Sequence, residues 1–217
     1  MREVILLDDT RLYLHDEGED LSNDIALKRD YFEKEILEYL AGRYPQQEII
    51  LDIGANIGNH SVYFSQYLEN VAIIAFEPVV ENYKLLTLNT RNLPNIITRN
   101  EAVGAFRGQV GLQVNQGNMG ACEIQKEYSV ERGDRKVQQV RVDDLFLIPR
   151  VTLIKIDVEW YEPEVLAGAK AIIADDQPLI LIEDANNTYG SLMPDNYVLL
   201  YPWVAHKTYL YGPVENA

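Results

Sequence analysis

The chain has 217 residues, of which 47% are hydrophobic and 24% charged, an ordinary balance for a globular protein with a sizeable core. Its 34 acidic and 19 basic residues give a net charge of −15, which repels the phosphates of nucleic acids and the surfaces of anionic membranes. We therefore expect neither a nucleic acid nor a membrane as a partner.

The N-terminal part, residues 1–47, is expected to form a hairpin and a helix that cap the rest of the chain. The hairpin covers residues 3–14, and a solvated acidic loop follows it. One helix, capped by Ser22 or Asp24, then runs to about Arg43. The first apolar run, four residues long, is too short for a signal peptide, so we expect a cytoplasmic protein.

From residue 48 to residue 184, strands and helices alternate, which predicts an α/β fold with a doubly wound, mostly parallel sheet. The regular elements are strand 48–53, helix 59–69, strand 71–76, helix 80–91, strand 95–99, strand 151–156, helix 162–174 and strand 178–183.

The middle of the chain interrupts this alternation. Residues 101–106 and 108–115 predict a hairpin, a loop rich in Gly and Asn runs to Gly120, and strand 136–142 precedes a short helical turn capped by Asp143 or Asp144. The single cysteine, Cys122, cannot form an internal disulfide and fits a reducing compartment.

The C-terminal part, residues 185–217, predicts two short strands, 197–201 and 207–211, which are joined at Pro202-Trp203 and form an antiparallel edge. We treat the N-terminal cap, the core and this hairpin as one domain, residues 1–217. A homo-oligomer is compatible with the sequence.

The turn after the first core strand carries the strongest functional signal. It reads Asp52-x-Gly54-x-Asn56-x-Gly58, and the next strand ends on an acid, Glu77, 25 residues after Asp52. This arrangement is typical of folds that hold a nucleoside cofactor, with glycines beside the ligand and the acid on the ribose hydroxyls. A tight turn without a ligand is the alternative.

The glycine spacing favours S-adenosylmethionine over a dinucleotide. A dinucleotide fingerprint has glycines where this chain has Asn56 and Asn59, and a carboxylate at Asp52 would repel a diphosphate. The same carboxylate suits the ammonium group of the methionine moiety. His60 follows the turn and either faces the cofactor or the acceptor, or simply covers the turn.

A second group of charged residues ends the strand 151–156. Alternation places Lys155, Asp157 and Glu159 on one face, and a buried lysine requires a partner, for which Asp157 or Glu183 is available. In the functional interpretation Asp157 faces the methionine end or an acceptor hydroxyl, Lys155 holds charge, and Glu159 is a candidate base. An internal ion pair without a catalytic role is the alternative.

Metal binding is a further alternative. Asp157, Asp184 and Asn186 or Asn187 could offer oxygen ligands to Mg²⁺, although such groups more often cap helices and turns. The three histidines are scattered, so no zinc site is predicted, and we expect no metal.

Together, these blocks resemble the FkbM-type S-adenosylmethionine-dependent methyltransferases in order and spacing. The resemblance implies a class I methyltransferase fold, a Rossmann-like seven-stranded sheet whose last hairpin is antiparallel. It also implies methyl transfer, usually to oxygen, on sugars, glycolipid or polysaccharide units, or secondary metabolites. The blocks are residues 52–61, 75–78, 100–104, 142–145, 154–159 and 162–169.

The resemblance assigns roles by position. Asp157 and Glu159 face a small-molecule acceptor and, together with Lys155 of the same strand end, are the catalytic candidates. Glu77 holds the ribose, and the loop 100–102 flanks the adenine. The complete set of cofactor candidates is Asp52, Gly54, Asn56, Gly58, Asn59, His60, Ser61, Glu77, Pro78, Asn100, Glu101, Ala102 and Asp157.

One position departs from the family pattern, which usually has glycine after Asp-Val-Glu where this chain has Trp160. The large ring could narrow the pocket mouth, stack on a sugar or move the loop. It motivates a second hypothesis, a non-catalytic S-adenosylmethionine-binding or scaffold protein; a nicotinamide-dependent oxidoreductase is the third. We expect residues 1–47 and 185–217 to determine acceptor specificity.

Overall fold

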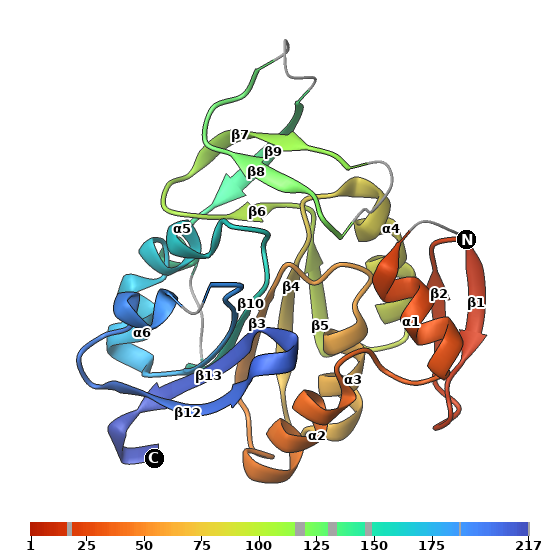
Figure 1. Ribbon diagram of the computed structural model, residues 1–217, viewed down its shortest axis with the longest axis horizontal. Coiled ribbons are helices and arrows are strands. Elements are labelled where there is room, and N and C mark those ends of the chain that lie inside the picture. The colour runs from red at the N-terminus through yellow and green to blue at the C-terminus, as the bar shows by residue number, and fades with distance from the viewer. Residues whose placement is uncertain (17–18, 116–119, 130–133, 146–148, 187, 217) are drawn as a thin grey trace.

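The computed structural model describes the chain except for residues 17–18, 116–119, 130–133, 146–148, 187 and 217 (Figure 1). Its largest layer is a seven-stranded sheet in the order β12-β13-β11-β10-β3-β4-β5. Neighbours from β11 to β5 are parallel, whereas β13 is antiparallel to both β11 and β12. The strands are β3 (Ile49–Ile53), β4 (Ala72–Phe76), β5 (Ile96–Arg99), β10 (Val151–Ile156), β11 (Leu179–Glu183), β12 (Tyr197–Trp203) and β13 (Thr208–Pro213).

Helices cover both faces of this sheet because alternate strand residues belong to two separate apolar clusters. Ile50 and Leu153 pack with α1, α2 and α3, while Leu51 and Ile154 pack with α5 and α6 on the other face. The predicted doubly wound, mostly parallel sheet with an antiparallel C-terminal hairpin is confirmed. The helices are α1 (Asp20–Lys28), α2 (Lys34–Arg43), α3 (Asn59–Tyr67), α4 (Val80–Thr90), α5 (Glu162–Ala167) and α6 (Lys170–Asp176).

The strand order reverses between β3 and β10, which start the two halves of the sheet. In open α/β sheets ligands bind outside the carboxyl ends of the strands at such a point. The register pairs Asp52 with Lys155 across these two strands. Both side chains therefore share a face of the sheet.

A four-stranded sheet in the order β6-β9-β7-β8 lies over the carboxyl end of the main sheet (Figure 1). The predicted hairpin of residues 101–106 and 108–115 is wrong, because β6 and β7 do not pair with each other. Instead β6 runs parallel to one edge of β9 and β7 runs antiparallel along the other. The strands are β6 (Ala102–Val103), β7 (Gly108–Gln113), β8 (Glu123–Gln125) and β9 (Arg135–Val140).

The single helix predicted to end near Arg43 is also wrong, since the chain forms two helices separated at residues 29–33. The Asn59 side chain accepts from the Phe32 N–H at 3.0 Å and donates to its carbonyl at 3.1 Å, so these groups are unavailable to a continuous helix. Neither Ser22 nor Asp24 is the cap. The Glu19 side chain accepts from the Ser22 N–H instead.

The helix predicted over 162–174 divides into α5 and α6 at Gly168. A Cβ on Gly168 would lie 2.1 Å from the Gly104 carbonyl oxygen, so glycine permits close contact with the small sheet. Asp143 supports the break, because its carboxylate accepts from the N–H groups of Ala171 and Ile172 at the start of α6. The predicted turn exists as η1 (Val142–Asp144), but Asp143 caps the later helix.

The N- and C-terminal parts form the expected hairpins. β1 (Arg2–Ile5) pairs with β2 (Arg11–Leu14), and β12 pairs with β13. Pro202-Trp203 belongs to β12, contrary to the prediction, and η3 (Val204–His206) makes the connection. Among the described residues no helix is both long and apolar enough to cross a membrane. Two further short helices are η2 (Tyr189–Leu192) and η4 (Val214–Asn216).

Candidate active site

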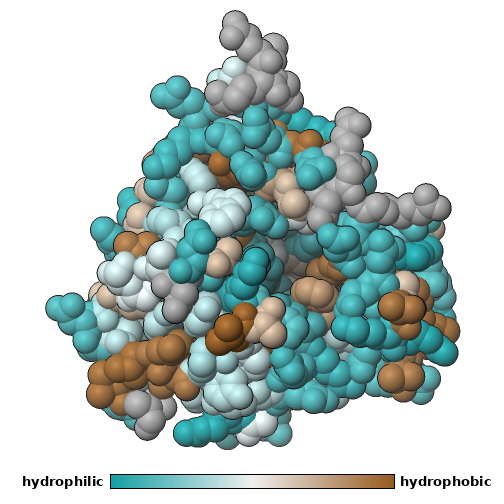
Figure 2. All heavy atoms as spheres, in the orientation of Figure 1, coloured by the Kyte–Doolittle hydropathy of each residue, from teal (hydrophilic) through white to brown (hydrophobic). Residues whose placement is uncertain are grey.

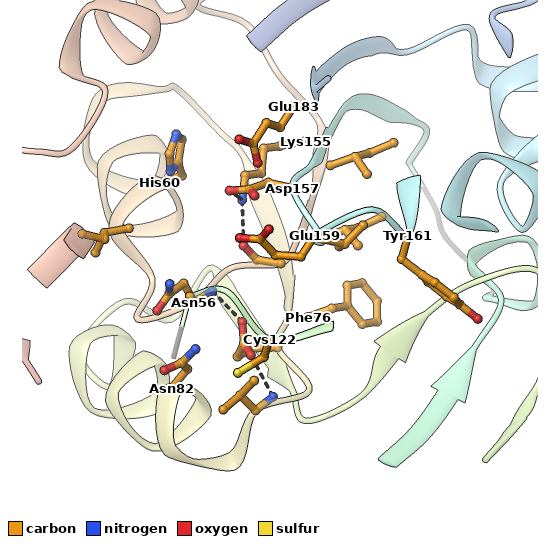
Figure 3. Close-up of a pocket in the computed structure, with 18 of the residues that line it drawn as sticks. Asn56, His60, Phe76, Asn82, Cys122, Lys155, Asp157, Glu159, Tyr161 and Glu183 are labelled. Atoms are coloured by element: carbon orange, nitrogen blue, oxygen red, sulfur yellow. Dashed lines mark hydrogen bonds and ion pairs between the residues drawn. The ribbon is translucent and has the colours of Figure 1, made fainter. Parts of the chain in front are cut away.

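A cavity of about 450 Å³ opens at the carboxyl ends of the central strands, below the small sheet (Figures 2 and 3). Its size lies within the range of ligand pockets. Several predicted site residues do not belong to its described lining: Asp52, Gly58, Asn59, Ser61 and Asn100. Those that do line it are Gly54, Asn56, His60, Glu77, Pro78, Glu101, Ala102, Lys155, Asp157 and Glu159.

The glycine turn forms one wall of the cavity. Gly54 and Gly58 have φ values of +78° and +91°, which favour glycine. A Cβ on Gly54 would lie 1.7 Å from the Asp157 carbonyl oxygen, so the glycine lets the tips of β3 and β10 meet. Beside it, Asn56 Oδ1 is buried without a hydrogen-bond partner among the described residues. The turn thus presents an unused acceptor at the pocket wall.

Glu77, directly after β4, is 4% exposed and lines the pocket. Its two carboxylate oxygens accept from the N–H groups of Asn56 and Val79, each at 2.8 Å. Burial raises the pKa of Glu77 to about 7, against the lowering effect of these two hydrogen bonds. Asn100 lies outside the pocket lining and donates to the carbonyl oxygens of Glu77 and Pro78, so it fixes the backbone of this acid.

Asp52 is fully buried beneath the pocket. It accepts from the Ser61 hydroxyl at 2.5 Å, and its other oxygen lies 3.5 Å from Lys155 Nζ. Lys155 also donates to the Gly54 carbonyl at 2.7 Å and lies 3.1 Å from Asp157, the partner expected for it. Burial would lower the pKa of Lys155, but Asp157 and Asp52 outweigh it and raise the pKa above its ordinary value. A direct contact between Asp52 and a cofactor stays a prediction: among the described residues Asp52 Oδ1 has no hydrogen-bond partner, although Lys155 Nζ lies 3.5 Å away.

Asp157 follows β10 and Glu183 ends the neighbouring strand β11, so the register places their carboxyl groups side by side in the cavity lining. Desolvation would raise the pKa of Asp157, but Lys155 and the hydrogen bond from Glu183 hold it below its ordinary value. Desolvation and the charge of Asp157 raise the pKa of Glu183 to about 9. Glu183 also lines the cavity, although the sequence suggested it only as a partner for Lys155.

Glu159 points into the cavity from the loop after β10 (Figure 3). Burial, followed by the negative charges of Asp157, Glu162 and Glu123, raises its pKa to about 7. Glu159 and Trp160 have φ values of +52° and +71°, a conformation that side chains other than glycine rarely adopt. The Trp160 ring is 56% exposed and does not belong to the described pocket lining.

His60 lies at the opposite wall, where its Nε2 is 3.3 Å from the Glu33 carboxylate. Its Nδ1 faces the Asn59 amide nitrogen at 3.3 Å, so Nδ1 is the acceptor and Nε2 carries the proton. Glu33 also approaches His206 Nδ1 at 3.6 Å. One carboxylate therefore links the start of α3 to the C-terminal hairpin.

Sequence reasoning did not assign the pocket walls that come from distant segments. Glu19 is buried, lines the cavity and accepts from the Asn56 amide at 3.3 Å. Glu19 and Asn56 are 37 residues apart, so no local sequence pattern predicts their contact. From the sequence, Glu19 belongs only to a solvent-exposed acidic loop. The other unassigned lining residues include Phe32, Glu33, Val79, Cys122, Ile124, Tyr161, His206 and Lys207.

The residues considered for Mg²⁺ do not converge. Asp184 is buried outside the described pocket lining, and its carboxylate accepts from the N–H groups of Asn186 and Tyr189. It therefore caps a turn, as acids of this kind commonly do. Asn187 lies outside the described residues.

Residues 52–197 match the family described as Methyltransferase FkbM domain. A curated relative, the hexuronic acid methyltransferase AglP of Haloferax volcanii, is 24% identical over 141 residues, or 63% of this chain and 56% of the relative. A solved FkbM methyltransferase from Methylobacillus flagellatus KT has 20% identity and a TM-score of 0.52 over 76% of this chain and 43% of that protein.

Precorrin-6y C5,15-methyltransferase from Geobacter metallireducens GS-15 shares the fold at 12% identity and a TM-score of 0.50, over 82% of this chain and 87% of that protein. The chain spans only about half the length of AglP and of the Methylobacillus protein. The family match, however, extends over more than half of the chain. The protein belongs to the FkbM methyltransferase family.

Proposed function

We propose that the protein transfers a methyl group from S-adenosylmethionine to a hydroxyl oxygen of a small acceptor. The observation that carries the proposal is the Glu77 carboxylate, which lies beside the glycine turn inside the cavity. Its oxygens can accept from both ribose hydroxyls while they hold the backbone of the turn. A pyrophosphate would instead meet acids at this wall, since Glu19 and Glu101 also line it.

The pocket fits S-adenosylmethionine on chemical grounds. Asn56 Oδ1 is an unused buried acceptor that suits an ammonium or a hydroxyl donor. Asp157, whose side chain is 40% exposed, supplies negative charge for the cationic end of the cofactor. Glu101 and Ala102 line the wall next to Glu77, where the adenine ring of the cofactor would lie. When bound, the cofactor supplies a methyl carbon made electrophilic by its positive sulfur.

Glu159 is the residue we assign as general base. A pKa of about 7 lets it accept a proton at neutral pH, and no cation is among the groups that shift it. Glu159 would accept the proton of an acceptor hydroxyl placed beside it. Bound S-adenosylmethionine would supply the methyl group to the hydroxyl oxygen, and its sulfur would keep the electron pair of the carbon–sulfur bond. Lys155 keeps Asp157 charged and in place, while the surrounding walls orient the reactants.

The acceptor class that we propose is a sugar-containing molecule or a secondary metabolite. AglP, which is named for methylation of a hexuronic acid, supports a sugar. The non-catalytic alternative loses its motivation, because Trp160 lies outside the described pocket lining. The open cavity therefore favours an enzyme over a scaffold.

Calorimetric titration with S-adenosylhomocysteine tests the cofactor assignment. We expect saturable binding at one site, and no heat at high protein concentration would end the proposal. Transfer of labelled methyl from S-adenosylmethionine to a panel of glycosides and uronides, followed by mass spectrometry, then tests turnover. Product methylated on oxygen supports the assignment, whereas product methylated only on nitrogen or carbon would contradict it.

A further inference from the structure

Glu183 and Asp157 form a pair of carboxyl groups at the acceptor wall of the cavity. The register pairs Ile156 of β10 with Ile182 of β11, so the next residue of each strand lies at the same level. Both side chains line the cavity and come together with Lys155 (Figure 3). Because the strands are parallel neighbours, the sheet itself fixes this contact.

Two carboxyl groups held side by side repel each other when both are ionised, and they can hydrogen-bond to each other only if one of them carries a proton. Lys155 Nζ lies 3.1 Å from Asp157 and stabilises the negative charge there. No corresponding cation contacts Glu183 among the described ion pairs, and Glu159 and Glu33 add negative charge around it. The proton therefore belongs to Glu183.

The remaining charged groups of the pocket do not change this assignment. His60 Nε2 faces the Glu33 carboxylate, 3.3 Å away. His206 also pairs with Glu33, through Nδ1, and with Glu35, through Nε2. Lys207 lines the pocket from an exposed position after η3. Asp157 is thus the charged member of the pair, and Glu183 the neutral one.

We propose that Glu183 is a positioning residue that keeps its proton and donates a hydrogen bond to Asp157, so that Asp157 stays oriented between Lys155 and the ligand. The role in methyl transfer rests on the proposed function; the position of the proton does not. A neutral acid at this wall also limits the negative charge that the pocket contains. The pKa of Glu183, raised to about 9, agrees with this arrangement at neutral pH.

Two variants of Glu183 distinguish the effect of its hydrogen-bond donor from the effect of its ability to ionise. Glu183→Gln keeps an N–H donor toward Asp157 but cannot ionise, whereas Glu183→Leu has similar volume and no donor. Carbon-13 NMR of the side-chain carboxyl groups of the full chain follows the titration of Asp157 and Glu183. Calorimetry with S-adenosylhomocysteine follows the consequence for the ligand.

In the wild type we expect one glutamate resonance to titrate near pH 9 and to be missing in Glu183→Gln. The Asp157 resonance should titrate at the same low pH in wild type and Glu183→Gln, and at higher pH in Glu183→Leu. The S-adenosylhomocysteine Kd should rise about tenfold or more in Glu183→Leu and be restored in Glu183→Gln. If Glu183→Leu does not fold, the wild-type and Glu183→Gln spectra still locate the proton.

The inference is overturned if every glutamate ionises below pH 7 in the wild type, or if Asp157 titrates identically in all three proteins. It is also overturned if Glu183→Gln weakens binding as much as Glu183→Leu. Absence of S-adenosylhomocysteine binding to the wild type would instead refute the proposed function. The NMR titration would still decide where the proton lies.

Discussion

Asp52 and Glu77 follow the same sequence logic, yet the structure places their carboxylates in different surroundings. Asp52 lies within β3, opposite Ala75 of β4, and is enclosed by Ser61 and Lys155. Glu77 lies one residue beyond β4, at the level of Gly54, and reaches the pocket. Along the parallel strands β3 and β4, Glu77 lies two residues closer to the carboxyl end than Asp52 does. This difference puts the Glu77 carboxylate inside the pocket and the Asp52 carboxylate beneath it.

Acids at the strand ends have two different roles in this fold. The lower level, Asp52 with Lys155, is an internal ion pair that supports the tips of two strands. The upper level, Glu77 and Asp157, faces the cavity and is available to a ligand. Variants of Asp52 or Lys155 should therefore mainly lower the free energy of unfolding. Variants of Glu77 or Asp157 should mainly weaken ligand binding.

The largest effect is expected from Lys155→Met at the lower level. It leaves both Asp52 and Asp157 without their cation, and breaking a buried pair costs about 3–5 kcal/mol of unfolding free energy. Urea denaturation measures this loss. The double variant with Asp52→Asn should recover part of it, and a loss below about 1 kcal/mol in the single variant would contradict the role of the pair.

Glu159→Gln tests the base at the upper level. We expect kcat to fall about 10²–10⁴-fold, the usual contribution of a general base, with unfolding free energy nearly unchanged. The wild-type kcat should rise with pH through about 7, because Glu159 must be ionised to accept the proton. Steady-state rates on any acceptor found in the panel measure both. If kcat of Glu159→Gln depends on pH in the same way as kcat of the wild type, Glu159 is not the general base.

Glu77→Gln tests the proposed ribose contact. Loss of a charged acceptor costs about 1.5–3 kcal/mol, or roughly tenfold to a hundredfold in the Kd of S-adenosylhomocysteine. With a pKa of about 7 for Glu77, wild-type affinity should rise with pH through that value, since the ionised carboxylate is the better acceptor. Calorimetry from pH 6 to 8 should show this step in the wild type and a flat profile in Glu77→Gln. A step of equal size in both proteins would assign the titration to another group.

The smallest effect is expected at the pocket rim. Trp160 has a left-handed conformation that costs about 1–2 kcal/mol for an L-residue, and glycine removes this cost at some loss of chain entropy. Trp160→Gly should therefore unfold with up to about 1 kcal/mol more free energy than Trp160→Ala, which keeps the strain. Both variants should bind S-adenosylhomocysteine as the wild type does. A glycine variant no more stable than Trp160→Ala would contradict the strain at this position.

The sequence predicted the main sheet well because alternating apolar runs specify strands and helices locally. It did not predict features that depend on distant contacts. The break before Lys34 arises because Asn59 binds the backbone of Phe32, and the pairing of β6 with β9 joins segments separated by more than thirty residues. The depth of Asp52 depends on register, which the spacing of Asp52 and Glu77 does not specify.

For the site, the sequence indicated the acids of the strand tips but not the walls that enclose them. Lys155, Asp157 and Glu159 form a recognisable local pattern, and the structure brings all three to the cavity. Glu19 and Glu33 come from the N-terminal part, which was expected to hold acceptor specificity. They lie beside Asn56 of the glycine turn and His60 of α3, where tertiary packing alone places them.

A crystal structure of the protein with S-adenosylhomocysteine would show whether Glu77 holds the ribose. We expect the nucleoside in the cavity, with both ribose hydroxyls within hydrogen-bond distance of the Glu77 carboxylate and Asp52 still beside Ser61 and Lys155. A nucleoside bound elsewhere, or one that leaves Glu77 in contact only with protein and solvent, would contradict this expectation.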